Sequence, residues 1–225
     1  MIDWIIQSRE LIKIIYALII ISICLVIVLR TNKLFRLSSH QGIRYFRNCF
    51  LFFGFGFFVR YILGSGYLMA TPTYFIIMNI LFEFFLIMAG FFLVYSLLWK
   101  KFELDNHSRS SLFNGKIIVF YLMSAIIVLL DYLWLTHSFM LWSQIILFAL
   151  AVIISFNNYI NNTPKGKFLK YYFIAMLMGF IAWVLNFLAA NYFHWDKTML
   201  MGVYGLNILL FLLFLFGVIK VTRDR

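Results

Sequence analysis

Residues 74–98 read YFIIMNILFEFFLIMAGFFLVYSLL, a continuous apolar stretch with one charged side chain, Glu83. A helix needs about 20 mostly apolar residues to cross the hydrocarbon core of a bilayer, so this stretch predicts a membrane-spanning helix. Six further stretches have the same character, at residues 11–29, 44–63, 117–135, 139–155, 170–190 and 199–220. The sequence therefore predicts an all-α membrane protein, a bundle of seven transmembrane helices in a single polytopic domain.

The composition excludes an ordinary soluble domain. The chain is 64% hydrophobic and only 12% charged, whereas globular proteins are about half apolar and about a quarter charged. We therefore expect the lipid bilayer to be its main partner. The net charge of +11 lies in short blocks between the apolar stretches, without a basic helix or a nucleic-acid-binding motif, so nucleic acid is not an expected partner.

The basic residues predict the direction of the chain. Fifteen of the 19 lysines and arginines fall in residues 30–47, 100–116 and 156–170 and in the tail from residue 220. Connections that are rich in lysine and arginine stay in the cytoplasm. The N-terminus is therefore expected outside and the C-terminus in the cytoplasm, in a cell membrane crossed several times.

The chain also predicts an internal repeat. A shift of 126 residues lays the first three apolar stretches over the last three, and in this register Arg60 falls on Asn186. After a two-residue insertion, Asn79 falls on Asn207. The expected layout is repeat one at about 11–98, a linker helix at about 117–135 and repeat two at about 139–220. An odd number of helices in each repeat and one linker helix give both repeats the same orientation in the membrane.

Polar residues inside the predicted helices mark a candidate site. Each acidic or basic side chain there costs roughly 2.5–3.5 kcal/mol on insertion and asks for a partner or a cavity. Counting along each helix places seven polar residues, charged and uncharged, in the outer half of the membrane: Arg60, Asn79, Glu83, Asp131, Gln144, Asn186 and Asn207. They predict an outward-facing polar cavity that binds a ligand.

Within this set, Glu83, Arg60 and Asn79 are the strongest candidates, because Asn79 and Glu83 share one helix face and Glu83 lies near the midplane. An unpaired Glu83 would be neutral, whereas a carboxylate paired with Arg60 would stay ionised. One alternative is that the asparagines and Gln144 only form interhelical hydrogen bonds, worth about 0.6 kcal/mol each. Another is that Arg60 extends to the lipid headgroups.

Catalytic and cofactor signatures are missing from the sequence. Asp131, His137, His194 and Asp196 are metal-binding residue types near the outer ends of helices, but their spacing matches no ligand template. No nucleophile with a partner histidine lies at one membrane depth. We therefore expect no metal and no cofactor, and an enzyme is disfavoured.

Two families have a similar topology. Seven helices in a three-one-three layout resemble the SWEET and PQ-loop transporters, but both prolines, Pro72 and Pro164, fall in connections here and no proline-glutamine pair is present. The same topology resembles the seven-helix sensory modules that precede histidine kinases in microbial receptors. A retinal protein is excluded, because the last helix has its lysine, Lys220, at the end.

The favoured hypothesis is a small-ligand-sensing module. Residue 225 lies only five residues past the last apolar stretch, so a signal is expected to pass through a separate cytoplasmic or membrane partner. The second hypothesis is a small-molecule or proton-coupled transporter of three-one-three architecture. The third is a structural or assembly factor whose polar residues only hold helices together.

Overall fold

The computed structural model describes residues 2–38, 41–65, 71–102, 115–161, 167–192 and 197–223, and its regular secondary structure there is helical throughout. The elements are α1 (Ile2–Ser38), α2 (Gln41–Phe57), η1 (Phe58–Leu63), α3 (Pro72–Phe102), α4 (Gly115–Trp134), α5 (Ser138–Asn161), α6 (Lys167–Asn191) and α7 (Lys197–Arg223). Each predicted stretch lies within one long helix to within a residue, with α2 and η1 together forming the second. The prediction of an all-α fold is confirmed.

Seven of these helical segments are long and apolar enough to cross a membrane. Large apolar side chains such as Leu25, Leu133 and Phe216 point outward and are more than half exposed. Because a soluble protein would have to expose this large apolar surface to water, which is unfavourable, these surfaces must contact lipid. The chain is therefore an integral, multi-pass membrane protein.

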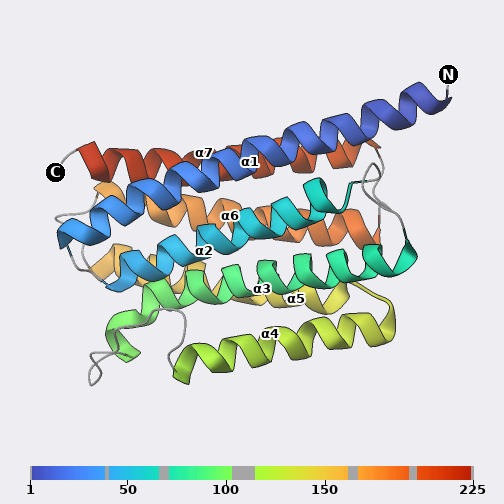
Figure 1. Ribbon diagram of the computed structural model, residues 1–225. Coiled ribbons are helices and arrows are strands. Elements are labelled where there is room, and N and C mark those ends of the chain that lie inside the picture. The colour runs from blue at the N-terminus through green and yellow to red at the C-terminus, as the bar shows by residue number, and fades with distance from the viewer. Residues whose placement is uncertain are drawn as a thin grey trace.

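Six helices form a closed ring, and α4 lies outside it (Figure 1). Around the ring, α1 packs against α2, α2 against α3, α3 against α5, α5 against α6, α6 against α7 and α7 against α1. The helix α4 packs against α3 and α5. The ring encloses the largest buried side chains, among them Phe50, Phe92 and Phe148.

The two halves of the ring have matching burial patterns. On α1 and α5 the buried positions agree at an offset of 124 residues, from Tyr16, Ala17, Ile20, Ile23, Cys24, Ile27 and Thr31 to Met140, Leu141, Gln144, Leu147, Phe148, Ala151 and Ser155. On α2 and α6 four buried positions correspond at 126 residues, from Cys49, Phe50, Phe53 and Gly56 to Ala175, Met176, Gly179 and Ala182, whereas the counterparts of Asn48, Phe52 and Phe57 are half-buried. The register of 126 residues predicted from the sequence applies to α2 and α6, whereas α1 and α5 correspond at 124 residues. The duplication itself stays a prediction.

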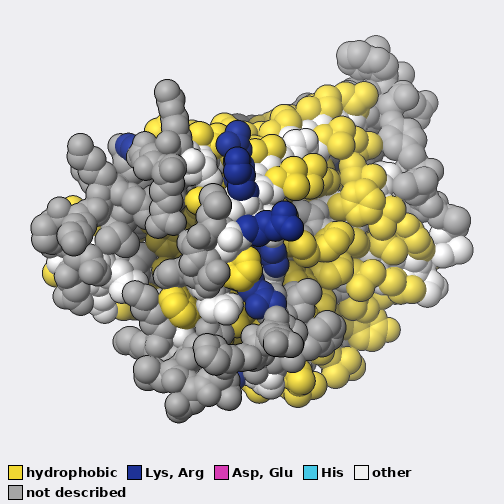
Figure 2. Space-filling view, turned by 60° about the vertical axis from the view of Figure 1, so that its left-hand side comes forward, with side chains coloured by type: hydrophobic (Ala, Val, Ile, Leu, Met, Phe, Trp, Pro, Cys, Tyr) yellow, Lys and Arg dark blue, Asp and Glu magenta, His cyan; other side chains and the backbone are white. Residues whose placement is uncertain are grey.

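Basic side chains gather at one end of the bundle, which we call the basic end. Among the described side chains, it holds Arg30, Lys33, Arg36, Arg44, Arg47, Lys116 and Lys220. Figure 2 shows lysine and arginine side chains together on this side, next to a broad apolar surface. Lys13 and Arg60 lie toward the opposite end. The direction of the bundle across the membrane stays a prediction from this asymmetry.

Candidate functional site

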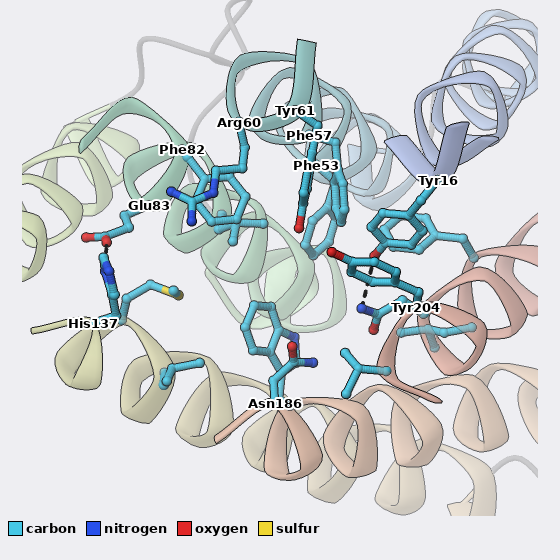
Figure 3. A pocket seen from close by; sticks show the side chains of 18 of the residues that line it. Tyr16, Phe53, Phe57, Arg60, Tyr61, Phe82, Glu83, His137, Asn186 and Tyr204 are labelled. Atoms are coloured by element: carbon cyan, nitrogen blue, oxygen red, sulfur yellow. Dashed lines mark hydrogen bonds and ion pairs between the residues drawn. The ribbon is translucent and has the colours of Figure 1, made fainter. Parts of the chain in front are cut away.

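A cavity of about 230 Å³ lies inside the six-helix ring. All six ring helices contribute to its wall, together with η1 and the α4–α5 connection, whereas no described residue of α4 lines it. Phenylalanine, tyrosine and tryptophan side chains make up half of the wall. Its polar groups are the side chains of Arg60, Glu83, His137, Asn186 and Asn207 and the hydroxyls of Tyr16, Tyr61 and Tyr204 (Figure 3).

Aromatic rings close the cavity toward the basic end. Phe50 of α2 and Phe214 of α7 both line the cavity, and their ring centroids lie 5.1 Å apart. One turn further, Phe46 contacts Phe214 at 6.2 Å and Tyr172 of α6 at 6.0 Å. The polar side chains therefore lie on the side of the cavity that faces away from the basic end.

A π-helical turn positions Arg60. In η1 the Gly64 N–H donates to the Val59 carbonyl five residues earlier, at 2.8 Å, so the end of the second span is wound more widely than an α-helix. The Tyr74 hydroxyl donates to the Leu63 carbonyl at 3.2 Å and satisfies a backbone group at its end. Such turns are rare and are frequent at functional sites. Here the turn presents both Arg60 and Tyr61 to the cavity.

The Arg60 guanidinium packs against two aromatic rings. It lies over the Phe82 ring at 5.3 Å and over the Phe75 ring at 5.9 Å from the centroids. Within the described part of the chain, no carboxylate pairs with it and no acceptor takes a hydrogen bond from it. Figure 3 shows its side chain extending into the cavity.

Glu83 is paired with His137. The Glu83 side chain is 6% exposed and its Oε1 lies 2.5 Å from His137 Nδ1, while the His137 side chain is 59% exposed at the rim. The hydrogen bond to Glu83 raises the pKa of His137; burial and the charge of Arg60 oppose this shift, whereas the charges of Glu83 and Asp131 add to it. The sequence left open whether Glu83 is unpaired or paired with Arg60. Its partner in the structure is instead His137, which the α4–α5 connection carries to the carboxylate.

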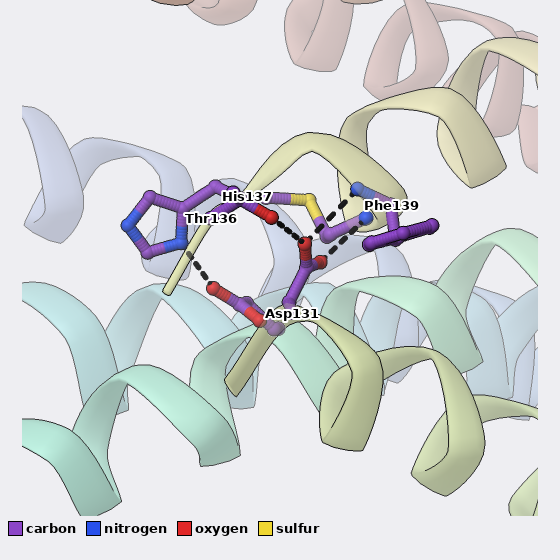
Figure 4. A network of polar contacts seen from close by, with 6 residues as sticks. Asp131, Thr136, His137 and Phe139 are labelled. Carbon is purple, nitrogen blue, oxygen red and sulfur yellow. Dashed lines mark hydrogen bonds and ion pairs between the residues drawn. The ribbon is translucent and has the colours of Figure 1, made fainter. Parts of the chain in front are cut away.

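Asp131 caps a helix. Its side chain is 1% exposed and accepts hydrogen bonds from the backbone N–H groups of Phe139 at 3.0 Å and Met140 at 2.7 Å, in the first turn of α5. The Thr136 hydroxyl donates to it at 3.1 Å (Figure 4). These N–H groups have no partner within their own helix. Asp131 does not line the cavity, and its contacts hold the α4–α5 connection against α5.

Gln144 and Asn79 also lie away from the cavity wall. Gln144 is fully buried on α5 and its Nε2 donates to the Leu86 carbonyl on α3 at 2.8 Å. This is an interhelical hydrogen bond of the kind that the sequence offers as an alternative. Asn79 is half-buried on α3. We do not include these two residues in the proposed site.

Asn186 and Asn207 line the cavity. The Asn207 Nδ2 donates to the Tyr16 hydroxyl at 3.1 Å and connects α7 to α1. The Asn186 Nδ2 donates to the Ala182 carbonyl of its own helix at 2.8 Å. Its amide points toward the cavity in Figure 3. The structure therefore brings together Arg60, Glu83, Asn186 and Asn207 from the seven expected residues.

Several cavity residues are missing from the sequence-based set. His137 looks like an ordinary surface histidine in the sequence, and Trp183 like a packing residue. Tyr16, Tyr61 and Tyr204 carry hydroxyls into the apolar interior, and the Tyr16 and Tyr204 rings stack at 4.2 Å. The depth of these tyrosines, close to that of Arg60, is the sequence feature that could have indicated their place in the cavity wall.

The structure shows no metal-binding arrangement among the described residues. His194 and Asp196 lie outside the described residues. Among the residues that are described, no three His, Cys, Asp or Glu side chains cluster as metal ligands would.

Comparisons with known proteins identify one similar chain of unassigned function. No protein-family model matches this sequence, and no solved structure matches this fold. The chain is 26% identical over 215 residues to an uncharacterized protein of Archaeoglobus fulgidus, a match that covers 91% of this chain and 90% of the relative. The similarity therefore extends over the whole seven-helix unit.

Proposed function

We propose that this chain is a seven-helix membrane protein that recognises a small ligand in the cavity of the ring and transmits the binding event to a separate partner. The observation that supports this most is the polar lining around Arg60, a cation inside the bundle without an acidic partner among the described residues. Such a charge is costly in a purely structural role. A ligand that enters the cavity would supply the missing partner.

The one-sided form of the cavity favours sensing. Its polar groups lie away from the basic end, and the rings of Phe46, Phe50 and Phe214 separate it from that end. With the basic end in the cytoplasm, as the charge distribution predicts, a ligand would reach the cavity from outside. Movement of the ring helices would then carry the signal to a partner at the basic end.

Transport is the second candidate, and the two matching halves of the ring favour it. Helices α1–α3 and α5–α7 surround one central cavity, and their buried positions correspond along the first two helices of each half. In transporters built from repeats, the substrate lies between the halves, which rock against each other. A conformation in which aromatic rings close the cavity toward the basic end is consistent with one stage of such a cycle.

The third candidate, a purely structural factor, explains Asp131 and Gln144 but not the cavity. Both side chains are buried and bonded to protein groups. Their role in holding helices together requires no ligand. Arg60, which has no acidic partner among the described residues, has no such explanation.

A ligand screen with a blocked cavity tests the proposal. The purified protein in nanodiscs is screened against a small-molecule collection by thermal shift, with Ala190→Phe as the variant that fills the cavity. Ile181→Phe, on an exposed position of the same helix, is the matched control. We expect hits to raise the melting temperature of the wild type and of Ile181→Phe only. Equal shifts in all three proteins would overturn the cavity as the binding site.

Flux measurements separate the two functions. The hits are tested for uptake into proteoliposomes, with the same two variants. Sensing predicts binding without net uptake. Substrate-dependent uptake that Ala190→Phe abolishes would identify a transporter instead.

A further inference from the structure

We propose that the ligand of this cavity is a small organic monoanion, a carboxylate attached to an aromatic body, with Arg60 holding the carboxylate. This inference rests on the proposed function, because it specifies the chemistry of the same cavity. It follows from the charge of the wall, the nature of its surface, its size and the acceptor oxygen of Asn186.

The charge of the wall is positive. Glu83 and His137 form one ion pair, so together they contribute no net charge when the pair holds its proton. Asp131 faces His137 from α4, but its oxygens accept three protein hydrogen bonds and do not line the cavity. Arg60 remains as the uncompensated charge of the described wall. An anion is the partner that this charge favours in a medium of low polarity.

Arg60 is also suited to a planar anion. A guanidinium presents a fork of N–H donors that fits the two oxygens of a carboxylate. The guanidinium carbon of Arg60 lies 5.9 Å from the ring centroid of Phe75 and 5.3 Å from that of Phe82. These rings take no hydrogen bond from it. Its donors therefore stay available to a ligand in the cavity.

The remaining wall favours an aromatic body. Phe53, Phe57, Trp183 and Phe211 line the cavity beyond Arg60. Flat aromatic groups pack against such rings in stacked or edge-to-face contacts. The volume of about 230 Å³ is below the range of about 300–1,000 Å³ that holds drug-sized ligands. One or two fused rings with a short acidic side chain match this space.

Asn186 adds a preference for a hydrogen-bond donor. Its Nδ2 donates to Ala182, and its carbonyl oxygen takes no hydrogen bond from the described residues. A ring N–H or hydroxyl on the ligand could donate to this oxygen. An indole acid or a hydroxyphenyl acid would then engage both Arg60 and Asn186.

Direct binding of matched acids and amides tests the inference. The probes are benzoate, phenylacetate, 3-phenylpropionate and indole-3-acetate, each compared with its neutral amide, by calorimetry on the wild-type protein in phosphatidylcholine nanodiscs. We expect at least one acid to bind at least about ten-fold more tightly than its amide, because the amide has no negative charge to pair with Arg60 and only one acceptor oxygen for two N–H donors of the guanidinium. This comparison needs no variant and is independent of folding defects.

Variants then locate the anion. Arg60→Gln should weaken binding of the best acid at least about ten-fold and leave the amide unchanged, and Arg60→Lys should retain part of the affinity. Lys13→Gln, a change of another cation toward the same end outside the cavity wall, is the matched control and should bind like the wild type. An acid that binds Arg60→Gln as tightly as the wild type would overturn the inference.

The remaining outcomes are equally decisive. Equal affinity for acid and amide, or no binding by any of the four acids, would overturn the ligand class. The proposed function would then be judged by the screen with Ala190→Phe, so the two failures are distinguishable. If phosphatidylglycerol but no carboxylate raises the melting temperature in an Arg60-dependent way, a lipid phosphate is the anion and the inference of a carboxylate ligand is overturned.

Discussion

Glu83 on α3 and His137 in the α4–α5 connection lie 2.5 Å apart and join the interior of one helix to the rim of the cavity. The carboxylate is almost fully buried, whereas the imidazole is 59% exposed. The next acidic group, Asp131, holds the same connection against α5. The two contacts together fix the rim of the cavity at the end away from the basic residues.

This pair predicts a pH-dependent stability. The raised pKa of His137 means that the folded protein binds this proton more tightly than the unfolded chain, whose histidines titrate at about 6.5. The stabilisation is complete below about pH 6.5 and is lost as the pH rises through the raised pKa. The melting temperature in detergent should therefore fall as the pH is raised above about 6.5.

His137→Gln tests the origin of this slope. The variant should flatten the pH dependence, and Glu83→Gln should do the same from the other side of the pair. His40→Gln changes a histidine outside the described residues and serves as the control. A slope in His137→Gln equal to that of the wild type would assign the dependence to another group.

Asp131→Ala should destabilise the bundle. The change removes the acceptor of two backbone N–H groups at the start of α5. Loss of a cap and of buried hydrogen-bond partners costs about 1–3 kcal/mol. Denaturation of the purified variant measures the effect, and Asp131→Asn, which retains one acceptor oxygen, should lose less. If both variants match the wild type, the capping role is wrong.

Gly179→Ala should destabilise the α5–α6 contact. A Cβ at this position would overlap the ring of Phe148, which lines the cavity. Overpacking of this kind costs about 1–3 kcal/mol. Gly205→Ala on α7 is the matched control, because a Cβ there meets no side chain or other helix within 4 Å in the described part of the chain. The control should gain up to about 1 kcal/mol from helix propensity, so unfolding should shift in opposite directions in the two variants.

The two ends of α4 allow a test of orientation. Leu135, at one end, is 89% exposed, and Lys116 at the other end is exposed as well. The native cysteines Cys24 and Cys49 are buried, so they give little background labelling. A membrane-impermeant maleimide should label Leu135→Cys in intact cells and Lys116→Cys only after lysis. Labelling of the second variant from outside would reverse the predicted topology.

The sequence predicts the helices well because the signal is long and local. Residues 74–98 lie within α3 (Pro72–Phe102), and their apolar length alone requires a membrane span. Glu83 stands out for the same reason, as a carboxyl in an otherwise apolar helix. Its position in the cavity wall follows from the ring that buries that face of α3.

The contacts of the site depend on features that the sequence does not carry locally. His137 reaches Glu83 only because the chain reverses after α4, where Leu135 adopts a φ of 50°. The π-helical turn that presents Arg60 depends on packing, since the residues 58–63 also suit an ordinary helix. The roles of Asp131 and Gln144 depend on which helices become neighbours. The burial of a polar side chain in the membrane and its free-energy cost do not by themselves distinguish a capping group from a ligand-binding group.

The position of α4 outside the ring has a consequence for the symmetry of the cavity. Three crossings leave the chain on the far side of the membrane, so a second set of three that followed directly would stand upside down relative to the first. The extra crossing by α4 returns the chain to its starting side. Arg60 and Asn186 can therefore face each other at one depth rather than at opposite ends of the cavity. The helix α4, which does not line the cavity, thus lets both halves of the ring place polar side chains on the same side of the cavity.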